Sequence, residues 1–292
     1  MRVALTANPK KPVAIAMAHR AVDAIAGRAE VVLSDQASAV APALPHAPLE
    51  ELEADVLVAI GGDGTFLYAL RRSSIPLLPV NAGTVGVLAE VEGKVPNGIE
   101  RALARMLDGA YYLEDRMKLA ADIGPLSLPD ATNEYLIHSG RVGKMGFFEI
   151  VLDGHPVGRI RADGLIVATP TGSTAYALSS LGPVVDPSVE GIVLTAIAPF
   201  RVEARALVID PLRRIGIRPL GASESSVVLP DGQEELPVGS GRTVTIYRSP
   251  RQATFVRFGA PFFESLRGKR ILPWTEVRGE EGGTDADLPP DP

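Results

Sequence analysis

Cysteine is absent from the 292-residue sequence, and histidine occurs only four times. Without thiols the chain has no disulfide framework, no thiolate zinc site and no cysteine nucleophile. The histidines, at positions 19, 46, 138 and 155, show no metal-ligand spacing. These absences argue against a zinc enzyme or a disulfide-stapled fold, and they are compatible with an intracellular location.

Long apolar runs and an excess of positive charge are also missing. No apolar stretch approaches the roughly 18 residues that span a bilayer. The apolar segment near the N-terminus is interrupted by Lys10 and Lys11 and follows no basic region, unlike a signal peptide. The formal net charge is −6, which gives no global positive field for nucleic acid or an anionic membrane. We therefore predict a cytoplasmic protein whose partners are neither nucleic acid nor a membrane.

The first 110 residues alternate predicted strands and helices, a pattern typical of an open α/β sheet. Strands are predicted over 2–8, 31–33, 55–60 and 76–80, and helices over 13–26, 65–72 and 98–107. The runs 55–60 and 76–80 are continuously apolar, as expected of parallel strands that are buried on both faces. The sequence therefore predicts an α/β domain over residues 1–110.

The pattern changes after residue 111 to short β-type runs separated by Gly, Asp and Pro. We predict a second, β-rich domain over 111–258, with one helix that begins near Ser173 and ends at Gly182. Apolar and aromatic residues at helical spacing over 259–275 predict a C-terminal segment that packs back on a domain. Residues 276–292 are rich in Gly, Pro and acidic residues and are predicted to be disordered.

The strongest local motif is GGDGT, Gly61–Thr65, which directly follows a buried strand. Glycines allow backbone N–H groups to approach phosphate oxygens, and a helix N-terminus favours negative charge. Asp63 would then lie among phosphates, either as a magnesium ligand or as a general base. A tight turn after a strand is the structural alternative. The phosphate motifs of Walker-type ATPases and of ordinary dinucleotide-binding dehydrogenases are absent.

Two further patches are rich in functional groups. One is Thr132-Asn133-Glu134. The other is Arg161–Ser180, in which a buried strand ends in the run Thr169–Tyr176, where small hydroxyl residues surround a glycine at a predicted helix start. Backbone donors, hydroxyls and an aromatic ring suit a nucleoside site. The alternative is a strand, a loop and a Ser/Thr helix cap, with Tyr176 in the core.

Taken in order along the chain, these motifs resemble the NAD kinase family. The matching segments are GGDGT, NAGTVGVL over 81–88, Asn133-Glu134 and DGLIVATPTGSTAY over 163–176. The resemblance continues through TAIAP over 195–199 and DGQ over 231–233, and it covers nearly all residues from 2 to about 274. It implies a Rossmann-like N-terminal domain, a β-rich C-terminal domain and transfer of the ATP γ-phosphoryl group to the 2′-hydroxyl of the adenosine ribose of NAD.

The resemblance also assigns expected roles to residues. Asp63 is the expected catalytic group, which accepts the hydroxyl proton beside the reacting ribose. The expected substrate-binding and phosphate-binding residues are Gly61, Gly62, Gly64, Thr65, Asn81, Asn133, Glu134, Arg161, Asp163, Thr171, Thr174, Ala175, Tyr176, Ser179 and Ala198. Within this set, Asp163, Thr171 and Ala198 match positions near the nicotinamide end, and Thr174 to Ser179 match positions around the adenosine.

A divalent ion, Mg²⁺ by preference, is the expected cofactor and accompanies ATP. Inorganic polyphosphate remains an alternative donor, because it offers the same terminal group. The family implies a homodimer or homotetramer in which a neighbouring subunit completes the dinucleotide site. Val87, Leu181, Phe200 and Ala206 depart from the commoner family wording. Changes at Leu181 and Phe200 affect the expected nicotinamide pocket or subunit contacts, so the choice between NAD and NADH stays open.

Two other functions compete with this interpretation. A lipid or sphingoid kinase shares the GGDGT loop, but the sequence lacks a long apolar segment and a basic amphipathic helix for a membrane substrate. A non-catalytic dinucleotide sensor would have no need of Asp63 next to phosphate. Neither alternative explains the combination of motifs as well as an NAD kinase does.

Overall fold

The N-terminal part of the computed structural model is a parallel α/β sheet. The model describes residues 1–83, 86–141, 143–201, 203–220, 226–239, 241–259, 262–268 and 271. The strands of this part are β1 (Arg2–Ala7), β2 (Glu30–Ser34), β3 (His46–Ala47), β4 (Val56–Gly61), β5 (Leu77–Asn81) and β6 (Val91–Glu92). All of their pairings are parallel. The helices are α1 (Pro12–Ile25), α2 (Asp63–Arg72) and α3 (Gly98–Leu107).

Helices cover both faces of this sheet, which explains why its strands are continuously apolar. Alternate residues of β1 and β4, such as Val3 and Val58, pack with α1 and α3. The intervening residues, such as Ala4 and Leu57, pack with Phe66 of α2 on the opposite face. A strand buried on both sides has no room for polar side chains until it ends. Polar side chains therefore gather at the strand ends.

The second part is a sandwich of antiparallel strands. One layer contains β7 (Tyr112–Ile123), β8 (Leu126–Ser127), β10 (Gly146–Leu152), β11 (His155–Ala162), β15 (Ile215–Leu220) and β18 (Val244–Arg257). The other contains β9 (Glu134–Ser139), β12 (Gly164–Ala168), β13 (Ile192–Ile197), β14 (Leu207–Ile209), β16 (Ser226–Pro230) and β17 (Leu236–Val238). Buried side chains from both layers, among them Leu119, Tyr135, Phe148 and Val167, form one core. The predicted fold class, an α/β domain followed by a β-rich domain, is confirmed.

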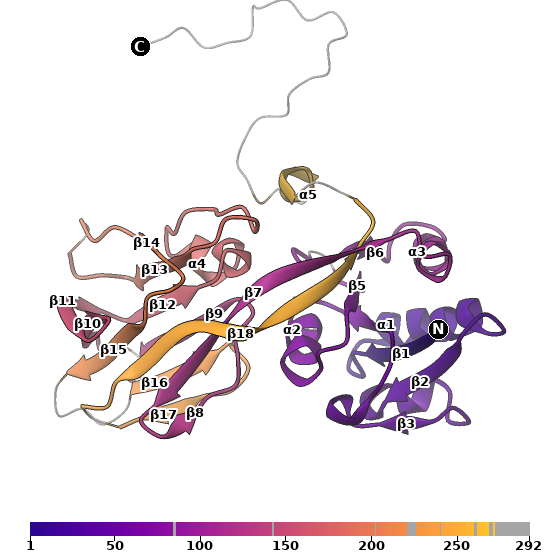
Figure 1. Cartoon of the computed structure of the whole chain (residues 1–292), viewed down its shortest axis with the longest axis horizontal. Coiled ribbons are helices and arrows are strands. Elements are labelled where there is room, and N and C mark those ends of the chain that lie inside the picture. Colours follow the sequence, from indigo (N-terminus) through magenta and orange to yellow (C-terminus); the bar gives the residue numbers. More distant parts are fainter. Residues whose placement is uncertain are drawn as a thin grey trace, which may run out of the picture.

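Two long strands join the halves of the molecule. β7 and β18 pair antiparallel from Val244↔Ile123 to Arg257↔Tyr112, with an irregularity between Arg248 and Gln252. At its far end β18 also pairs with β5, through Phe255 and Leu77. Figure 1 shows this ribbon running from the β-rich part into the N-terminal sheet. Both parts therefore share one continuous 12-stranded sheet within the described residues.

Several local predictions need correction. The segment between the strands predicted at 31–33 and 55–60 contains the 3-10 helices η1 (Asp35–Val40) and η2 (Leu49–Glu51), which were not predicted. The single helix expected after Ser173 is divided into η3 (Thr171–Thr174) and α4 (Tyr176–Ser179), because Ala175 has ψ near −128° and interrupts the helical backbone. Strand β11 was not predicted, since most of its residues are exposed and two of them are arginines. Strand β15 was not predicted either, because Gly216, Arg218 and Pro219 interrupt its short apolar pattern.

The C-terminal segment is described only in part. Residues Phe262–Gly268 form α5, in which Leu266 is buried. The predicted disordered tail, 276–292, and most of the remainder after 268 lie outside the described residues. In the part of the chain that the structure covers, every helix is too short or too polar to cross a membrane.

Candidate active site

The GGDGT motif forms the turn between a buried strand and a helix. β4 ends at Gly61, Gly62 is the N-cap in an extended conformation, and α2 begins at Asp63. A Cβ atom at Gly61 would lie 2.3 Å from Oγ1 of Thr65, so only glycine allows the first helical turn to fold back on the strand. The turn exposes backbone N–H groups at a helix N-terminus, which favours a bound anion.

The carboxylate of Asp63 is held by backbone amides of the segment that follows β5. Val87 N donates to Oδ2 at 3.0 Å, and Leu88 N donates to Oδ1 at 3.3 Å. Hydrogen bonds from amides to a charged acceptor are strong and directional. They fix both carboxylate oxygens of Asp63.

A cavity of about 530 Å³ lies against the glycine loop. Gly62, Gly64 and Thr65 line it on one side, and Lys10 and Lys11 line it on the other. A Cβ atom built on Gly62 or on Gly83 would lie 3.5 Å from Nζ of Lys11, so the ammonium group is next to both glycine segments. Backbone amides facing a cation are suited to a polyphosphate. Sequence reasoning missed Lys11, because the pair was considered only as an interruption of the apolar N-terminus.

Asn81 and Thr65 are committed to internal contacts in this region. Asn81 is buried at the end of β5. Its Oδ1 accepts a hydrogen bond from Gly83 N at 2.7 Å, and its Nδ2 donates one to Glu92 at 2.8 Å. Thr65 Oγ1 accepts from Asn8 Nδ2 at 3.4 Å. Both residues therefore shape the loops around Asp63.

The turn Asp231–Gln233 brings the β-rich part to the glycine loop. The Asp231 carboxylate accepts hydrogen bonds from the backbone N–H groups of Thr132, Asn133 and Glu134, at 2.9, 2.7 and 3.2 Å. Gln233 Nε2 donates to the carbonyl of Gly64 at 3.3 Å. Burial raises the pKa of the Asp231 carboxyl, and the three amide bonds oppose that rise. The motif was noted only as part of a resemblance, and its bridging position required the tertiary structure.

Asn133 and Glu134 present buried acceptors at this junction. Each residue is 7% exposed. Oδ1 of Asn133 and Oε2 of Glu134 are buried and have no hydrogen-bond partner among the described residues. Burial, and secondarily the charge of Asp231, raises the pKa of Glu134 to about 8. Unpaired buried acceptors are costly, and hydroxyl donors of a ligand would satisfy them.

The Thr169–Tyr176 run packs directly on this pair. A Cβ atom at Gly172 would lie 2.1 Å from the carbonyl oxygen of Asn133, so glycine is required for the close approach. Thr169 Oγ1 donates to Thr132 O at 2.6 Å and accepts from Gly172 N at 3.0 Å. Several hydroxyls of the run thus hold the loop itself, whereas Tyr176 is 41% exposed rather than in the core.

The remaining residues of the run point to a second cavity. A cleft of about 430 Å³ is lined by Val87 and Leu88, by Thr171 and Thr174, and by α5. Thr171 accepts a hydrogen bond from Arg116 at 3.4 Å, while Ala175 and Ser179 lie at either end of α4. The cleft therefore lies between the loop that holds Asp63 and the loop expected to contact a nucleoside.

Arg161, Asp163 and Ala198 lie elsewhere in the same chain. Antiparallel pairing places Ala168, at one end of β12, beside Glu134, and places Gly164, at the other end, beside Ile197. At about 3.3 Å per residue, Asp163 and Thr169 are roughly 20 Å apart. Arg161 instead packs over the ring of Phe200 at 5.3 Å. Within one chain, these three residues are separate from the group around Asp63.

The fold and the site together define a class of protein. An α/β domain supplies a glycine turn, a fixed carboxylate and a cation-lined cavity, and a β-rich domain adds unpaired acceptors beside it. This combination suits a kinase, an enzyme that transfers a phosphoryl group to a hydroxyl by positioning the reactants and neutralising charge.

Comparisons with known proteins identify the family. Residues 3–111 match the ATP-NAD kinase N-terminal domain, and residues 132–258 match the ATP-NAD kinase C-terminal domain. An NAD kinase of Thermococcus gammatolerans is 38% identical over 267 residues, which cover 88% of this chain and 94% of that protein. An NAD kinase of Thermococcus kodakarensis is 39% identical over 219 residues, or 74% of this chain and 78% of that protein. The chain belongs to the NAD kinase family.

Solved structures agree with this assignment. An NAD kinase from Archaeoglobus fulgidus, crystallised in complex with ATP, has 31% identity and a TM-score of 0.77 over 93% of this chain and 100% of that one. A yeast NADH kinase complexed with NADH has a TM-score of 0.81 over 96% of this chain and 90% of that one. At 22% identity, the second comparison supports the fold alone.

Proposed function

We propose that this member of the NAD kinase family phosphorylates the 2′-hydroxyl of the adenosine ribose of NAD with ATP, and that Asp63 accepts the hydroxyl proton. The reaction class, formation of NADP from NAD, follows from family membership. The observation that supports this role for Asp63 is its position between the two cavities. Its neighbours Gly62 and Gly64 line the lysine-rich cavity, and the amides that hold its carboxylate line the cleft.

The proposed step requires alignment more than covalent chemistry. The 2′-oxygen attacks the γ-phosphorus as its proton passes to Asp63, the bond from phosphorus to the bridging oxygen breaks, and ADP leaves. Lys11 and the glycine amides offset the negative charge of the transferring group. Because the Asp63 oxygens are already fixed by Val87 N and Leu88 N, little reorganisation accompanies proton transfer.

The residues present fit a metal that arrives with the nucleotide. Among the described residues, no group of three or more His, Cys, Asp or Glu side chains is arranged for a metal ion. Mg²⁺ commonly takes phosphate oxygens, waters and one or two carboxylates as ligands, and Asp63 is the carboxylate at the glycine loop. When bound with ATP, Mg²⁺ supplies charge neutralisation at the phosphates.

We assign the ribose hydroxyls to the unpaired acceptors of the β-rich part. Glu134 Oε2 and Asn133 Oδ1 are buried beside the Asp231–Gln233 turn, which contacts Gly64 next to Asp63. A hydroxyl that donates to these atoms would be held near the proton acceptor. This arrangement favours a nucleoside sugar over a lipid hydroxyl.

We further propose that a second copy of the chain completes the dinucleotide site. Asp163, Arg161 and Ala198 lie at the opposite end of β12 from Glu134, so one chain does not bring them to the same ligand. A neighbouring subunit of a homodimer or homotetramer would supply them to the nicotinamide end.

The test is an assay with NAD, ATP and Mg²⁺, with product identified as NADP by an NADP-specific dehydrogenase. NADP formation supports the kinase. Dinucleotide binding without product supports a sensor, and turnover only with a sphingoid or lipid alcohol supports a lipid kinase. Parallel reactions with NADH, and with polyphosphate in place of ATP, identify the preferred acceptor and donor.

A further inference from the structure

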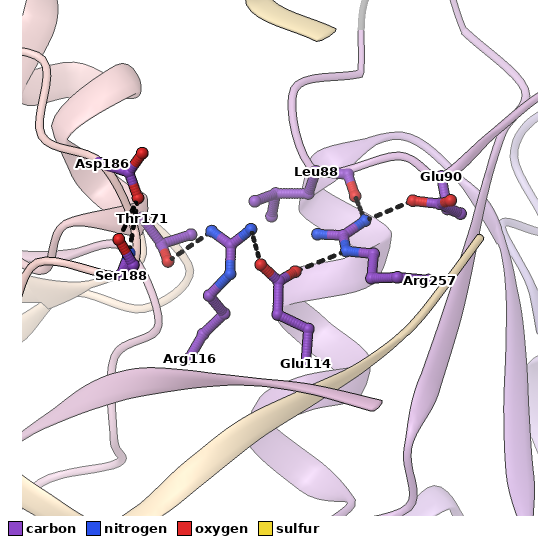
Figure 2. A network of polar contacts seen from close by, with 8 residues as sticks. All are labelled: Leu88, Glu90, Glu114, Arg116, Thr171, Asp186, Ser188 and Arg257. Atoms are coloured by element: carbon purple, nitrogen blue, oxygen red, sulfur yellow. Dashed lines mark hydrogen bonds and ion pairs between the residues drawn. The ribbon is translucent and has the colours of Figure 1, made fainter. Parts of the chain in front are cut away.

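A partly buried ion network outside the reacting groups connects the two halves of the site. Glu114 of β7 is hydrogen-bonded through Oε2 to Nε of Arg257 on β18, at 2.7 Å, and through Oε1 to Nη2 of Arg116, at 2.8 Å. The two arginine side chains are 11% and 7% exposed. Figure 2 shows Glu114 between the two guanidinium groups.

One arm of the network reaches the loop that orients Asp63. Arg257 Nη1 donates to the carbonyl of Leu88 at 3.1 Å and to Glu90 Oε2 at 3.2 Å. The amide of the same Leu88, with that of Val87, donates to the Asp63 carboxylate. Leu88 is therefore a link in a chain of hydrogen bonds: its carbonyl accepts one from Arg257 of β18, and its N–H group donates one to Asp63.

The other arm reaches the loop expected to contact the nucleoside. Arg116 Nη1 donates to Thr171 Oγ1 at 3.4 Å, the longest contact of the series. Thr171 in turn accepts from Thr174 through its carbonyl at 3.1 Å. Both arginines also pack against Phe255, at 6.0 and 4.6 Å from its ring centroid. Figure 2 shows the two arms extending in opposite directions from Glu114.

The charges of this network are balanced, which argues against an anion-binding role for the arginines. Glu114 and Glu90 face Arg116 and Arg257. Burial opposes ionisation of Glu114, but hydrogen bonds from both arginines outweigh it and lower the pKa of that carboxyl. A charged Glu114 can accept from two guanidinium groups at once.

We propose that Glu114 is a positioning residue, which fixes the Asp63-orienting loop and the Thr171 loop relative to each other through Arg257 and Arg116. The inference rests on the proposed role of Asp63 as proton acceptor. Glu114 itself contacts neither reacting group. Because β7 and β18 are the strands shared by both parts of the molecule, a single carboxylate at their end is well placed to set the spacing of the cleft.

The variant Glu114→Gln tests this role. Glutamine offers one carbonyl acceptor, and its NH₂ group faces the second guanidinium with a donor. Loop displacements of about an ångström can cost on the order of 100-fold in rate, so we expect kcat to fall about 10- to 100-fold. The arm toward Thr171 ends in the longest contact of the network, at 3.4 Å, so we expect a smaller change in KM for NAD, of less than about threefold. Asp115→Asn is the matched control, because Asp115 is exposed on the same strand and bonds only to Thr254 in the described structure.

A double-mutant cycle with Asp63→Asn separates positioning from general destabilisation. If Glu114 acts through Asp63, Glu114→Gln should lower the residual single-turnover rate of Asp63→Asn less than about threefold, since coupled residues are not additive. An equal loss in both backgrounds would overturn the proposal, and so would a Glu114→Gln enzyme as active as Asp115→Asn. Full activity of Asp63→Asn alone would instead refute the role of Asp63, a distinguishable failure of the proposed function.

Arg257→Lys provides a second route if Glu114→Gln unfolds. Lysine keeps the charge but lacks the guanidinium fork that contacts Glu114 and Leu88 O together. Thermal unfolding of each variant shows whether it is folded at the assay temperature. We expect Arg257→Lys to show the same split, a loss of kcat with KM for NAD retained, and an unchanged kcat in a folded Arg257→Lys enzyme would contradict the proposal.

Discussion

The two acidic groups of the site differ in how the protein treats them. Asp63, in the α/β part, has both carboxylate oxygens held by backbone amides of one short loop. Glu134, in the β-rich part, is buried with one oxygen unpaired among the described residues and has a raised pKa. In the proposed reaction the first group is oriented for proton transfer before substrate arrives, whereas the second has a hydrogen-bonding capacity that a ligand would satisfy. The comparison assigns reaction to one region and recognition to the other.

The largest effect should come from Asp63→Asn, which removes the proton acceptor but keeps the side chain's shape. General-base catalysis contributes about 10²- to 10⁴-fold, so we expect kcat to fall by that order while the dissociation constant for NAD changes little. Steady-state NADP formation and calorimetric titration measure the two quantities. An Asp63→Asn enzyme with full turnover would remove the functional contrast between the two acids.

An intermediate effect is expected at Lys11, which lies beside the glycine loop on the cavity side. Lys11→Met should raise KM for ATP about tenfold, equivalent to about 1.4 kcal/mol of binding free energy, with KM for NAD nearly unchanged. Lys94→Met is the control, because Lys94 is exposed and lines neither cavity among those described. If KM for NAD rises instead, the lysine-rich cavity belongs to the acceptor and the two regions exchange roles.

The third prediction concerns stability rather than activity and sharpens the description of Glu134. Burial raises the pKa of Glu134 from 4.5 to about 8. Between these two pH values Glu134 is protonated in the folded state and ionised in the unfolded state. The unfolding free energy should therefore fall over this interval, by up to about 1.4 kcal/mol per pH unit from this group. Glu134→Gln should reduce that slope and should be relatively more stable at pH 8 than at pH 5.

Denaturant unfolding across this pH range is the appropriate measurement for Glu134. Glu53→Gln serves as the control, because Glu53 is exposed and should leave the slope as in the natural chain. An identical slope in Glu134→Gln and the natural chain would mean that Glu134 is ionised in the folded protein. The contrast with Asp63 would then lie only in their hydrogen bonds.

The glycine turn was predictable because its chemistry is local. A continuous apolar run identifies a strand buried on both faces, and GGDGT immediately after it places Asp63 at a helix start, as the structure has it. The Thr169–Tyr176 run was located correctly, but the break at Ala175 was not foreseen. The same run approaches Asn133 closely at Gly172, a contact between segments far apart in the sequence.

The residues that connect the two parts of the molecule were not predictable, because their contacts also join segments far apart in the sequence. Asp231 contacts residues about a hundred positions earlier, and Gln233 contacts Gly64 across an even longer separation. Glu114, Arg116 and Arg257 carry no motif that distinguishes them from ordinary charged residues of strands. Their partners are set by the pairing of β7 with β18 and by the loop that follows β5.

The order of motifs along the chain by itself determined the family and the α/β and β-rich halves, and it predicted Asp63 as the proton acceptor of the proposed step. Backbone conformation near a glycine turn and burial of a parallel strand are encoded within a few residues, so the sequence suffices for them. Only the tertiary structure decided that Lys11 borders the glycine loop, that Asp231 and Gln233 join the two halves, and that Asp163 lies at the far end of its sheet from Glu134. Those relations arise from contacts between distant segments, whose geometry no local pattern specifies.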